Sequence, residues 1–299
     1  MKALFYVLGT SAATPKPKRA LPSYYFEHEG IGILMDCGEG TQFQVMKAGI
    51  GFSKIKVIAI SHNHGDHLLG LPGLIETMSM GSRKEDLLII GPPGIKEFLE
   101  VSFKVTTFAP SFKVYVLEIT EEVEVPLRGI KLKMFPVKHH GYSFGIRVET
   151  VPKRKVNKEK LEELGVPKRL WGRLQQGEEV EWKGRVLKPE EFTWQPQGIK
   201  VVYSGDTAPC ERVIEEARGA DLLVHEATFL SDMEEEAHER GHSTAKDAGI
   251  IASEAKVKML LLTHYSSRYE DLRRHLDEAR RFFEYAYLAQ DLMKVVIKK

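Results

Sequence analysis

Cysteine, asparagine and long apolar runs are scarce in this chain, and each scarcity excludes a class of protein. The 299 residues include two cysteines, Cys37 and Cys210, whose spacing fits neither a disulfide framework nor a metal motif. We find no signal peptide and no apolar run long enough to cross a membrane, so we expect a cytoplasmic protein. Asparagine occurs only at positions 63 and 157, amid many Lys, Arg and Glu residues, a bias typical of thermophiles.

An excess of charge of either sign is also absent. Lys and Arg number 43 and Asp and Glu number 42, which gives a formal net charge of +1. The whole protein is therefore no polyelectrolyte, and any affinity for nucleic acid must come from local patches. The hydrophobic fraction of 42% can fill a sizeable core, and large sandwich domains of this length occur as one unit.

The chain does contain a cluster of side chains of metal-binding types directly after the apolar run 55–60. His62, His64, Asp66 and His67 place four potential ligands within six residues. The preceding run is β-branched and apolar, which predicts a buried strand, and open α/β sheets carry their chemistry at the carboxyl ends of strands. Imidazole and carboxylate together suit zinc, with manganese or iron as alternatives. A polar loop with incidental histidines is the weaker interpretation.

Three later residues extend this cluster. His139, Asp206 and His264 each follow a segment that is predicted to be a strand. A single His or Asp in such a place is usually a cap or a turn former. Together with the first cluster, these residues predict convergence at one edge of a sheet.

The seven side chains suit a centre of two metal ions. A carboxylate has two oxygens and can serve two cations about 3.5–4 Å apart. Six of the side chains divide into two sets of three, and the seventh, Asp206, can bind both ions. The first ion would be held by His62, His64 and His139, and the second by Asp66, His67 and His264.

This ligand pattern resembles that of the metallo-β-lactamase superfamily and, more narrowly, that of the ribonuclease Z family. Further segments carry the narrower resemblance in the family's order along the chain: residues 8–11 (LGTS), 36–42 (DCGEGTQ), 225–229 (HEATF), 241–245 (GHSTA) and 264–269 (HYSSRY). They run from the first predicted strand to about 30 residues before the C-terminus, so the resemblance covers nearly the whole chain.

The resemblance implies an α/β fold, a four-layer αβ/βα sandwich, with two Zn²⁺ per subunit. It implies a hydrolase, an endoribonuclease that removes the 3′ trailer from tRNA precursors and leaves a 3′-hydroxyl on the tRNA and a 5′-phosphate on the trailer. The tRNA precursor is then the expected partner. Members of the family commonly form homodimers, and we expect one here.

Three residues receive catalytic roles. Asp66 would orient the attacking water and accept its proton, besides binding the second ion. His242 lies outside the ligand set and would donate a proton to the leaving 3′-oxygen, with Glu226 holding its imidazole and favouring the cation. The alternative for His242 is a structural position before a helix that Ser243 and Thr244 cap.

The segment around His139 offers a second histidine, His140. The family's ligand lies six residues before the glycine of an aromatic–glycine pair, here Gly145, and this spacing selects His139. Neighbouring residues of an extended chain point in opposite directions. We therefore expect His140 to lie beside the ligands or to face the substrate.

Up to about residue 150, strand-like and helical segments alternate. The predicted strands are 3–8, 24–28, 31–36, 57–60, 87–90, 113–117 and 131–137, and the predicted helices are 41–48, 67–80 and 95–105. A C-terminal helix over about 270–287 would place Leu272, Leu276, Ala279 and Phe283 in the core.

Residues 151–198 interrupt this order. Eight Lys and Arg residues against three Glu give the stretch 151–175 a charge of +5, and all three tryptophans (Trp171, Trp182 and Trp194) lie in the segment. We predict a single domain over 1–299 with an inserted substrate-binding arm at about 151–198. In ribonuclease Z relatives an insertion here protrudes and grips the tRNA. The alternative is a solvated helical hairpin packed on the body, with the tryptophans as its small core.

Several basic and polar side chains are candidates for binding the RNA, because cations neutralise phosphates and release counterions. Arg268 could instead pair with a helix carboxylate. In bacterial relatives a P-x-K-x-R-N loop is associated with rejecting tRNAs that already end in CCA. Arg19 lies in a loop that matches only part of this pattern, so the resemblance does not extend to this property in full. The candidates are Arg19, Lys153, Arg154, Lys155, Lys168, Arg169, Ser266 and Arg268.

Two other classes of protein share parts of the pattern. Another hydrolase on the same fold, acting on a small phosphodiester or thioester, would share the ligands but has less reason for the basic segment. A non-catalytic RNA-binding or zinc-stabilised interaction protein would typically have lost ligands, and here every expected ligand is present. Cleavage of a chromogenic diester but not of a tRNA precursor would favour the first of these.

Overall fold

The computed structural model describes residues 1–299, which form two compact units. One unit, here called the inserted unit, is the segment Thr150–Gly198 together with Met1. The other, here called the body, joins Lys2–Glu149 to Ile199–Lys299 and contains two seven-stranded sheets. No helix of either unit is long and apolar enough to cross a membrane.

The first sheet has the strand order β18-β1-β2-β3-β4-β5-β6. Its strands are β1 (Lys2–Gly9), β2 (Ser23–His28), β3 (Ile31–Met35), β4 (Ile55–Ala59), β5 (Leu87–Gly91), β6 (Val114–Glu118) and β18 (Lys294–Lys298). Strands β3 to β6 run parallel, so their carboxyl ends meet at one edge of the sheet. Apolar side chains of α1 (Thr41–Lys47), α3 (Leu71–Met80) and α4 (Ile95–Val105) cover its outer face.

The second sheet has the order β17-β16-β15-β14-β9-β8-β7. Its strands are β7 (Val123–Leu127), β8 (Ile130–Pro136), β9 (Phe144–Thr150), β14 (Lys200–Tyr203), β15 (Leu222–Glu226), β16 (Leu260–Thr263) and β17 (Ala286–Leu288). Helices α8 (Glu211–Ala217), α10 (Ala245–Glu254) and α11 (Arg273–Arg280) cover its outer face, and α9 (Glu234–Glu239) precedes α10.

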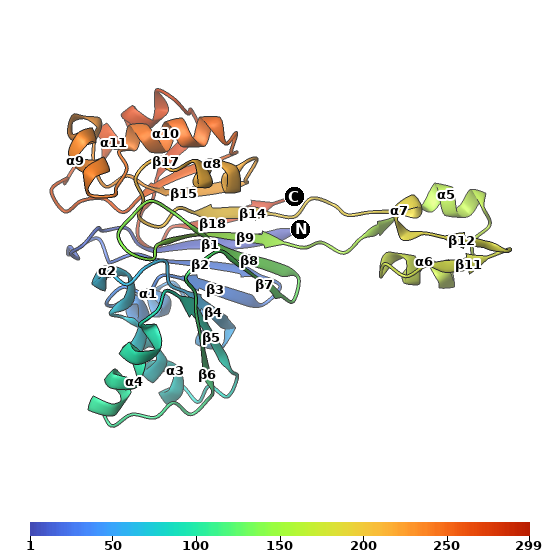
Figure 1. Cartoon of the computed structure of the whole chain (residues 1–299), viewed down its shortest axis with the longest axis horizontal. Helices are drawn as coiled ribbons and strands as arrows, with labels where there is room; N and C mark the ends of the chain where they lie inside the picture. Colours follow the sequence, from blue (N-terminus) through green and yellow to red (C-terminus); the bar gives the residue numbers. More distant parts are fainter. The chain divides into compact units, whose positions relative to one another are not determined.

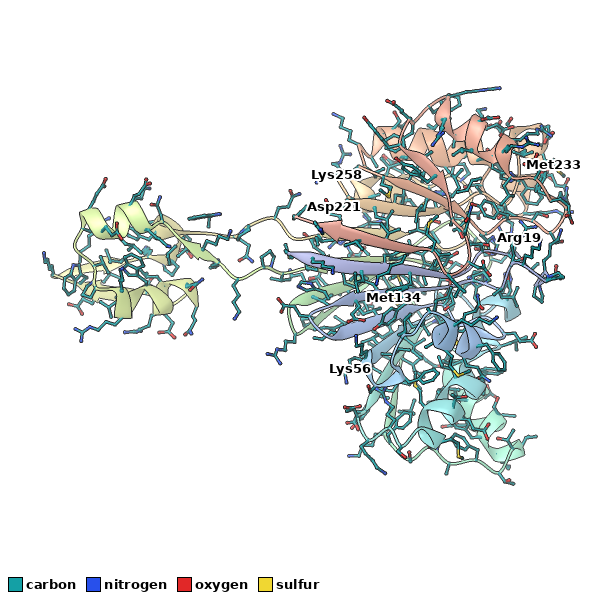
Figure 2. The ribbon with its side chains drawn as sticks, turned by 180° about the vertical axis from the view of Figure 1, so that it is seen from behind. Arg19, Lys56, Met134, Asp221, Met233 and Lys258 are labelled. Atoms are coloured by element: carbon teal, nitrogen blue, oxygen red, sulfur yellow. The ribbon has the colours of Figure 1, made fainter.

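The two sheets of the body face each other across a shared apolar core, with helices outside each of them (Figure 1). Phe5 and Tyr24 from the first sheet meet Met134 and Val224 from the second in this core, and all four side chains are buried; Figure 2 labels Met134. The body is thus the four-layer αβ/βα sandwich that the sequence predicts.

Two predicted helices differ from the structure. The segment 67–80 is broken into α2 (Gly65–Leu68) and α3, because Gly70 packs against the loop after β3 and its amide donates to the Cys37 carbonyl at 2.9 Å. The prediction of a single C-terminal helix over 270–287 is wrong. Helix α11 ends at Arg280, and the strand β17 then pairs in parallel with β16. The predicted core positions of this segment do pack into the core.

The inserted unit has its own small mixed core. Its elements are β10 (Lys155–Val156), α5 (Lys158–Glu163), α6 (Lys168–Gln175), β11 (Val180–Trp182), β12 (Arg185–Leu187), α7 (Pro189–Phe192) and β13 (Thr193–Trp194). It is therefore no helical hairpin. Trp171 is in its core and Trp182 packs against that core, but Trp194 is 50% exposed, so the tryptophans do not form the core together.

Candidate metal centre

The seven predicted ligands lie together in the body, each just beyond the carboxyl end of a strand. Residues 62–67 follow β4, His139 follows β8, Asp206 follows β14 and His264 follows β16. These strands belong to both sheets, so the cluster lies where the two layers of the sandwich open at one end. The seven side chains therefore come together only through the fold, because the four segments that carry them are far apart in the sequence.

The first group consists of three imidazoles and one carboxylate. His64 Nδ1 lies 3.3 Å from His139 Nε2, and His62 Nε2 lies 3.7 Å from Asp206 Oδ2. One donor atom from each of the four residues lies within 4.8 Å of the others, close enough for them to share an ion. His140 is outside this group, with its ring centroid 6.2 Å from that of His64.

The second group adjoins the first. His264 Nε2 lies 3.4 Å from Asp66 Oδ2 and 3.4 Å from His67 Nε2. The Asp206 Oδ2 atom lies 3.3 Å from the Nε2 atoms of both His67 and His264. Asp206 thus reaches both groups, as a bridging carboxylate must.

The donor set fits cations rather than a closed hydrogen-bond network. His62 Nε2 and Asp206 Oδ1 are buried and have no hydrogen-bond partner. Buried polar atoms nearly always have a partner, since an unpaired one costs about 1–3 kcal/mol. A cation held by imidazole nitrogen and carboxylate oxygen would satisfy both atoms.

Asp36, which is not among the predicted site residues, organises the second group. Its carboxylate accepts hydrogen bonds from His67 Nδ1–H at 2.7 Å, from the Ser61 amide and hydroxyl at 2.7 and 2.9 Å, and from the Tyr203 hydroxyl at 2.8 Å. The bond to Nδ1 leaves Nε2 of His67 free to face the cluster. Asp36 follows β3 directly, so the strand-end rule that found the ligands could have found it.

The other ring orientations depend on groups that the sequence also left unassigned. The Gly241 carbonyl lies 2.7 Å from His139 Nδ1, and the Thr228 hydroxyl oxygen lies 2.8 Å from His264 Nδ1. The carbonyl can only accept, and the Thr228 hydroxyl gives its own proton to Glu226 Oε2 at 2.6 Å, so both contacts assign the imidazole proton to Nδ1 and turn Nε2 toward the cluster. A Cβ on Gly241 would lie 2.8 Å from His139 Nδ1, so the close approach requires glycine.

Electrostatics differ between the two groups. Burial lowers the pKa of His62, His64 and His139, which favours the neutral imidazoles that bind metals. At His67 burial acts in the same direction, but the carboxylates led by Asp206 outweigh it and raise the pKa. Burial would raise the pKa of Asp206, yet the surrounding imidazoles hold it well below its ordinary value. The second group therefore has negative charge to offer a cation.

His242 lies beside the cluster and is held by Glu226. Its Nδ1 donates to Glu226 Oε1 at 2.9 Å, and its ring stacks 5.6 Å from that of His264. Burial lowers the pKa of His242, but the adjacent carboxylate outweighs it and raises the pKa to about 9. Glu226 is itself buried and accepts further bonds from the Thr207 and Ser243 amides at 2.7 and 3.0 Å.

The alternative role of His242, a structural position before a capped helix, is also consistent with the structure. Thr244 caps α10, since its hydroxyl accepts from the Asp247 amide at 3.1 Å and the Asp247 side chain bonds back to the Thr244 amide. His242 with Asp206 and His264 also forms a set that could hold an ion.

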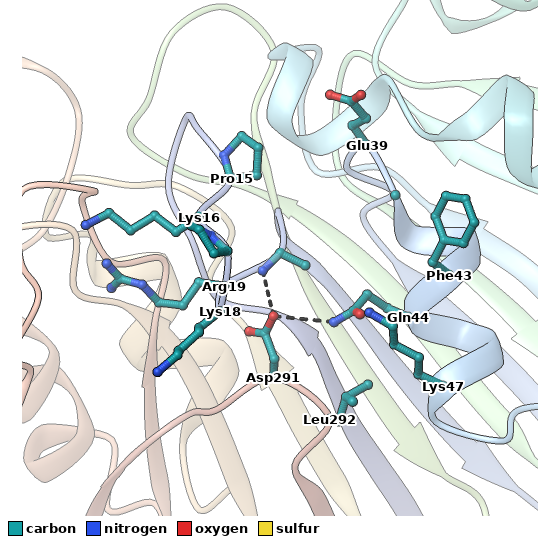
Figure 3. A pocket seen from close by; sticks show the side chains of 13 residues that line it. Pro15, Lys16, Lys18, Arg19, Glu39, Phe43, Gln44, Lys47, Asp291 and Leu292 are labelled. Carbon is teal, nitrogen blue, oxygen red and sulfur yellow. Dashed lines mark hydrogen bonds between the residues drawn. The ribbon is translucent and has the colours of Figure 1, made fainter.

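The loop around Arg19 lines a cavity of about 570 Å³ beside α1. Figure 3 shows Lys16, Lys18 and Arg19 on one side of it and Phe43 of α1 on the other. Arg19 is half-buried and donates to the Tyr269 carbonyl at 2.7 Å, so part of its guanidinium is occupied by the protein.

Ser266 and Arg268 follow the ligand His264. Ser266 is half-buried, and its amide donates to the Thr228 carbonyl at 3.2 Å. Arg268 is exposed and lies over the Phe229 ring at 5.1 Å, rather than beside a helix carboxylate.

The remaining candidates lie in the inserted unit. Lys153, Lys155, Lys168 and Arg169 are exposed. Arg154 is half-buried, and its guanidinium donates to the Thr193 hydroxyl at 3.3 Å. Four of these five cations are therefore exposed and outside ion pairs, and Lys168 Nζ lies over the Trp171 ring at 5.9 Å.

The chain is similar to known proteins over its whole length. The model of the family described as "Anti-Pycsar protein Apyc1" matches residues 3–156, and that of a beta-lactamase superfamily domain matches residues 170–265. Ribonuclease Z of Ignicoccus hospitalis is 61% identical over 298 residues, covering 100% of this chain and 99% of the relative. Ribonuclease Z of Saccharolobus islandicus is 42% identical, with coverages of 98% and 99%. The crystal structure of human tRNase Z, short form, is similar with a TM-score of 0.72 and 28% identity, covering 99% of this chain and 98% of that one.

Proposed function

The chain belongs to the ribonuclease Z family, and on this premise we propose that it is the endoribonuclease that removes the 3′ trailer from tRNA precursors. The observation that carries the proposal is the meeting of seven His and Asp side chains from four separate segments in two adjoining groups. Each group can hold one cation, and the two cations would then be neighbours. Hydrolysis of a phosphodiester by two metal ions requires such a pair.

We propose two Zn²⁺ ions per subunit. The first would be held by His62, His64 and His139, the second by Asp66, His67 and His264, and both by Asp206. When bound, such ions acidify water and neutralise the charge that develops on the phosphate. Imidazole and carboxylate donors support zinc.

The chain's own groups supply the proton transfers. Asp66 Oδ2 accepts a hydrogen bond from the Ala13 amide at 2.8 Å and lies 3.4 Å from His264 Nε2, so its carboxylate is held where it can orient water and take its proton. His242, oriented by Glu226, would give a proton to the leaving 3′-oxygen. The products are a tRNA with a 3′-hydroxyl and a trailer with a 5′-phosphate.

The proposal is tested by incubating the zinc-loaded protein with a tRNA precursor and, separately, with a chromogenic phosphodiester. We expect a single cut that releases a 5′-phosphorylated trailer from the precursor. Hydrolysis of the diester without cleavage of the precursor would overturn the endonuclease assignment and favour a small-molecule phosphodiesterase.

The role of His242 is tested by His242→Ala. We expect turnover to fall by about 10²–10⁴-fold, the range for loss of a general acid, while the zinc content per chain stays that of the wild type. A loss of zinc would instead make His242 a ligand, through the set that it forms with Asp206 and His264.

We further propose that the body is one metallo-β-lactamase-fold domain and that the inserted unit is its substrate-binding arm. The exposed Lys153, Lys155, Lys168 and Arg169 support this role, because cations outside ion pairs can neutralise phosphates. Exchanging all four for Ala should weaken tRNA binding and flatten its dependence on salt.

We also propose a homodimer that works in the cytoplasm. Phe43 and Met46 of α1, and Leu69 after α2, expose large apolar side chains that a second copy could cover. The buried thiols of Cys37 and Cys210 are unpaired, which suits a reducing compartment. Sedimentation should give a dimer for the wild type and a shift toward monomer for Phe43→Glu; a monomeric wild type would refute the dimer.

A further inference from the structure

The inserted unit carries an aromatic side chain that its own core does not use. Trp171 is 9% exposed and donates its indole N–H to the Val166 carbonyl at 2.9 Å, and Trp182 donates to the Leu164 carbonyl at 3.2 Å. Trp194 is 50% exposed. An indole in water exposes apolar surface that a ligand can cover.

The strand register places a lysine next to this indole. Strands β10 and β13 pair antiparallel, with Lys155 opposite Trp194 and Val156 opposite Thr193. Val156 packs against the unit's core and Thr193 is buried, so this pair faces inward. Because side chains alternate along a strand, Lys155 and Trp194 share the outer face, where directly opposite Cβ atoms lie about 4.5–5.5 Å apart.

The same face borders a cavity of about 480 Å³. Its lining consists of Lys155, Val156, Asn157, Lys158, Glu159, Gln175 and Trp194. This size falls in the range of about 300–1,000 Å³ that is usual for small-ligand sites. All lining residues belong to the inserted unit, so the cavity is formed within that unit alone.

The charges of the cavity favour an anion. The ion pairs within the unit join Arg173 to Glu178 and Arg185 to Glu191, so the ammonium groups of Lys155 and Lys158 have no carboxylate partner. Glu159 is the one acidic residue of the lining. An aromatic face beside two free ammonium groups is the combination that binds an unpaired nucleotide, whose base stacks and whose phosphate is anionic.

We propose that this cavity binds one unpaired nucleotide of the RNA substrate, with its base stacked on the Trp194 indole and its phosphate bound by Lys155 and Lys158. The proposal rests on the proposed function, since it takes RNA as the substrate. It assigns a specific contact to the arm: stacking on one indole, in addition to a general attraction between lysines and phosphates.

The test uses the full-length, zinc-loaded protein and the variants Trp194→Ala, Trp194→Phe and, as a control, Tyr285→Ala, which removes an equally exposed ring of the body (55% exposed). Stacking of a base on an aromatic ring contributes about 1–3 kcal/mol. Trp194→Ala should therefore raise KM for the tRNA precursor by about 5- to 150-fold and leave kcat unchanged. Trp194→Phe should restore most of the affinity, with a KM near that of the wild type, and Tyr285→Ala should have the KM of the wild type.

A binding measurement separates this proposal from the proposed function. Titration with tRNA should quench the tryptophan fluorescence of the wild type and much less that of Trp194→Phe, whether or not the RNA is cut. The double variant Lys155→Ala, Lys158→Ala should lower the slope of log affinity against log salt by between about one and two.

The outcomes are distinguishable. A KM within about twofold of the wild type for Trp194→Ala, together with unchanged quenching, would overturn the stacking site while leaving cleavage of the precursor intact. Quenching by an acidic peptide but not by tRNA, or by adenosine monophosphate as tightly as by tRNA, would also overturn it. Failure of the wild type to cut the precursor would overturn the proposed function, and the titration would still decide whether RNA binds here.

Discussion

At the scale of single residues, the candidate metal centre depends on side chains outside the predicted ligand set. Asp36 receives four hydrogen bonds, one of them from His67, and is fully buried. It also has a positive φ of 59°, a conformation that Asn and Asp tolerate better than most residues. Such second-layer contacts set the direction in which a ligand presents its nitrogen.

The variant Asp36→Asn tests this arrangement without disturbing the backbone, because Asn tolerates the same φ. Loss of the carboxylate charge should weaken zinc binding at the second group by about 10- to 100-fold. Competition with a chromophoric chelator measures the affinity, and circular dichroism checks the fold. Zinc affinity equal to that of the wild type would show that Asp36 has a purely structural role.

At the scale of elements, the break between α2 and α3 positions the ligand-bearing turn. Gly70 approaches the loop after β3 so closely that a Cβ would lie 2.0 Å from the Gly38 carbonyl oxygen. The same loop begins at Asp36, so one contact joins the two segments that hold His67. A continuous helix over this stretch would not allow that approach.

Gly70→Ala should therefore destabilise the protein by about 1–3 kcal/mol or more, because backbone must move to admit a methyl group. Gly172→Ala is the matched control: Gly172 lies within α6 with nothing within 4 Å of its Cβ position, so alanine should be neutral or stabilise by up to about 1 kcal/mol. Denaturant unfolding of both variants measures the difference. Equal stabilities would contradict the packing argument.

At the scale of the whole molecule, a buried histidine makes folding sensitive to acid. His275 of α11 is fully buried, and neither ring nitrogen has a hydrogen-bond partner. Burial, reinforced by Arg19 and Arg274, lowers its pKa to about 4. The unfolded chain therefore takes up a proton at a higher pH than the folded one, and stability falls as pH drops from about 7 to 4.

Replacing this residue should remove that part of the acid sensitivity. A pKa lowered from 6.5 to about 4 corresponds to roughly 3 kcal/mol lost below pH 4. His275→Leu should flatten the fall of stability between pH 7 and 4 by about this amount, as measured by denaturant unfolding at several pH values. The predicted metal ligands are common to both proteins, so parallel pH profiles would show that His275 is not the cause.

Metal binding should also be visible in the stability of the whole chain. The cluster draws on segments of both sheets, so an ion that binds only the folded state stabilises all of them together. Removal of zinc should lower the melting temperature, since one ion at 100 times its Kd contributes about 2.7 kcal/mol. Asp206→Asn should reduce this dependence; a melting temperature insensitive to a chelator would speak against the bound ions.

The sequence alone predicted which His and Asp side chains would meet, and its resemblance to the metallo-β-lactamase superfamily implied the layer order. Strand periodicity and the spacing of His and Asp residues are properties of short segments, so the seven candidate ligands and most strands of the body's two sheets were predictable from local pattern. The tertiary structure alone decided that Asp36 binds His67, that the helix breaks at Gly70 and that β17 is a strand, because each depends on a partner distant along the chain. It also decided that Trp171 is buried and Trp194 exposed, since burial depends on what packs against a side chain and not on its type.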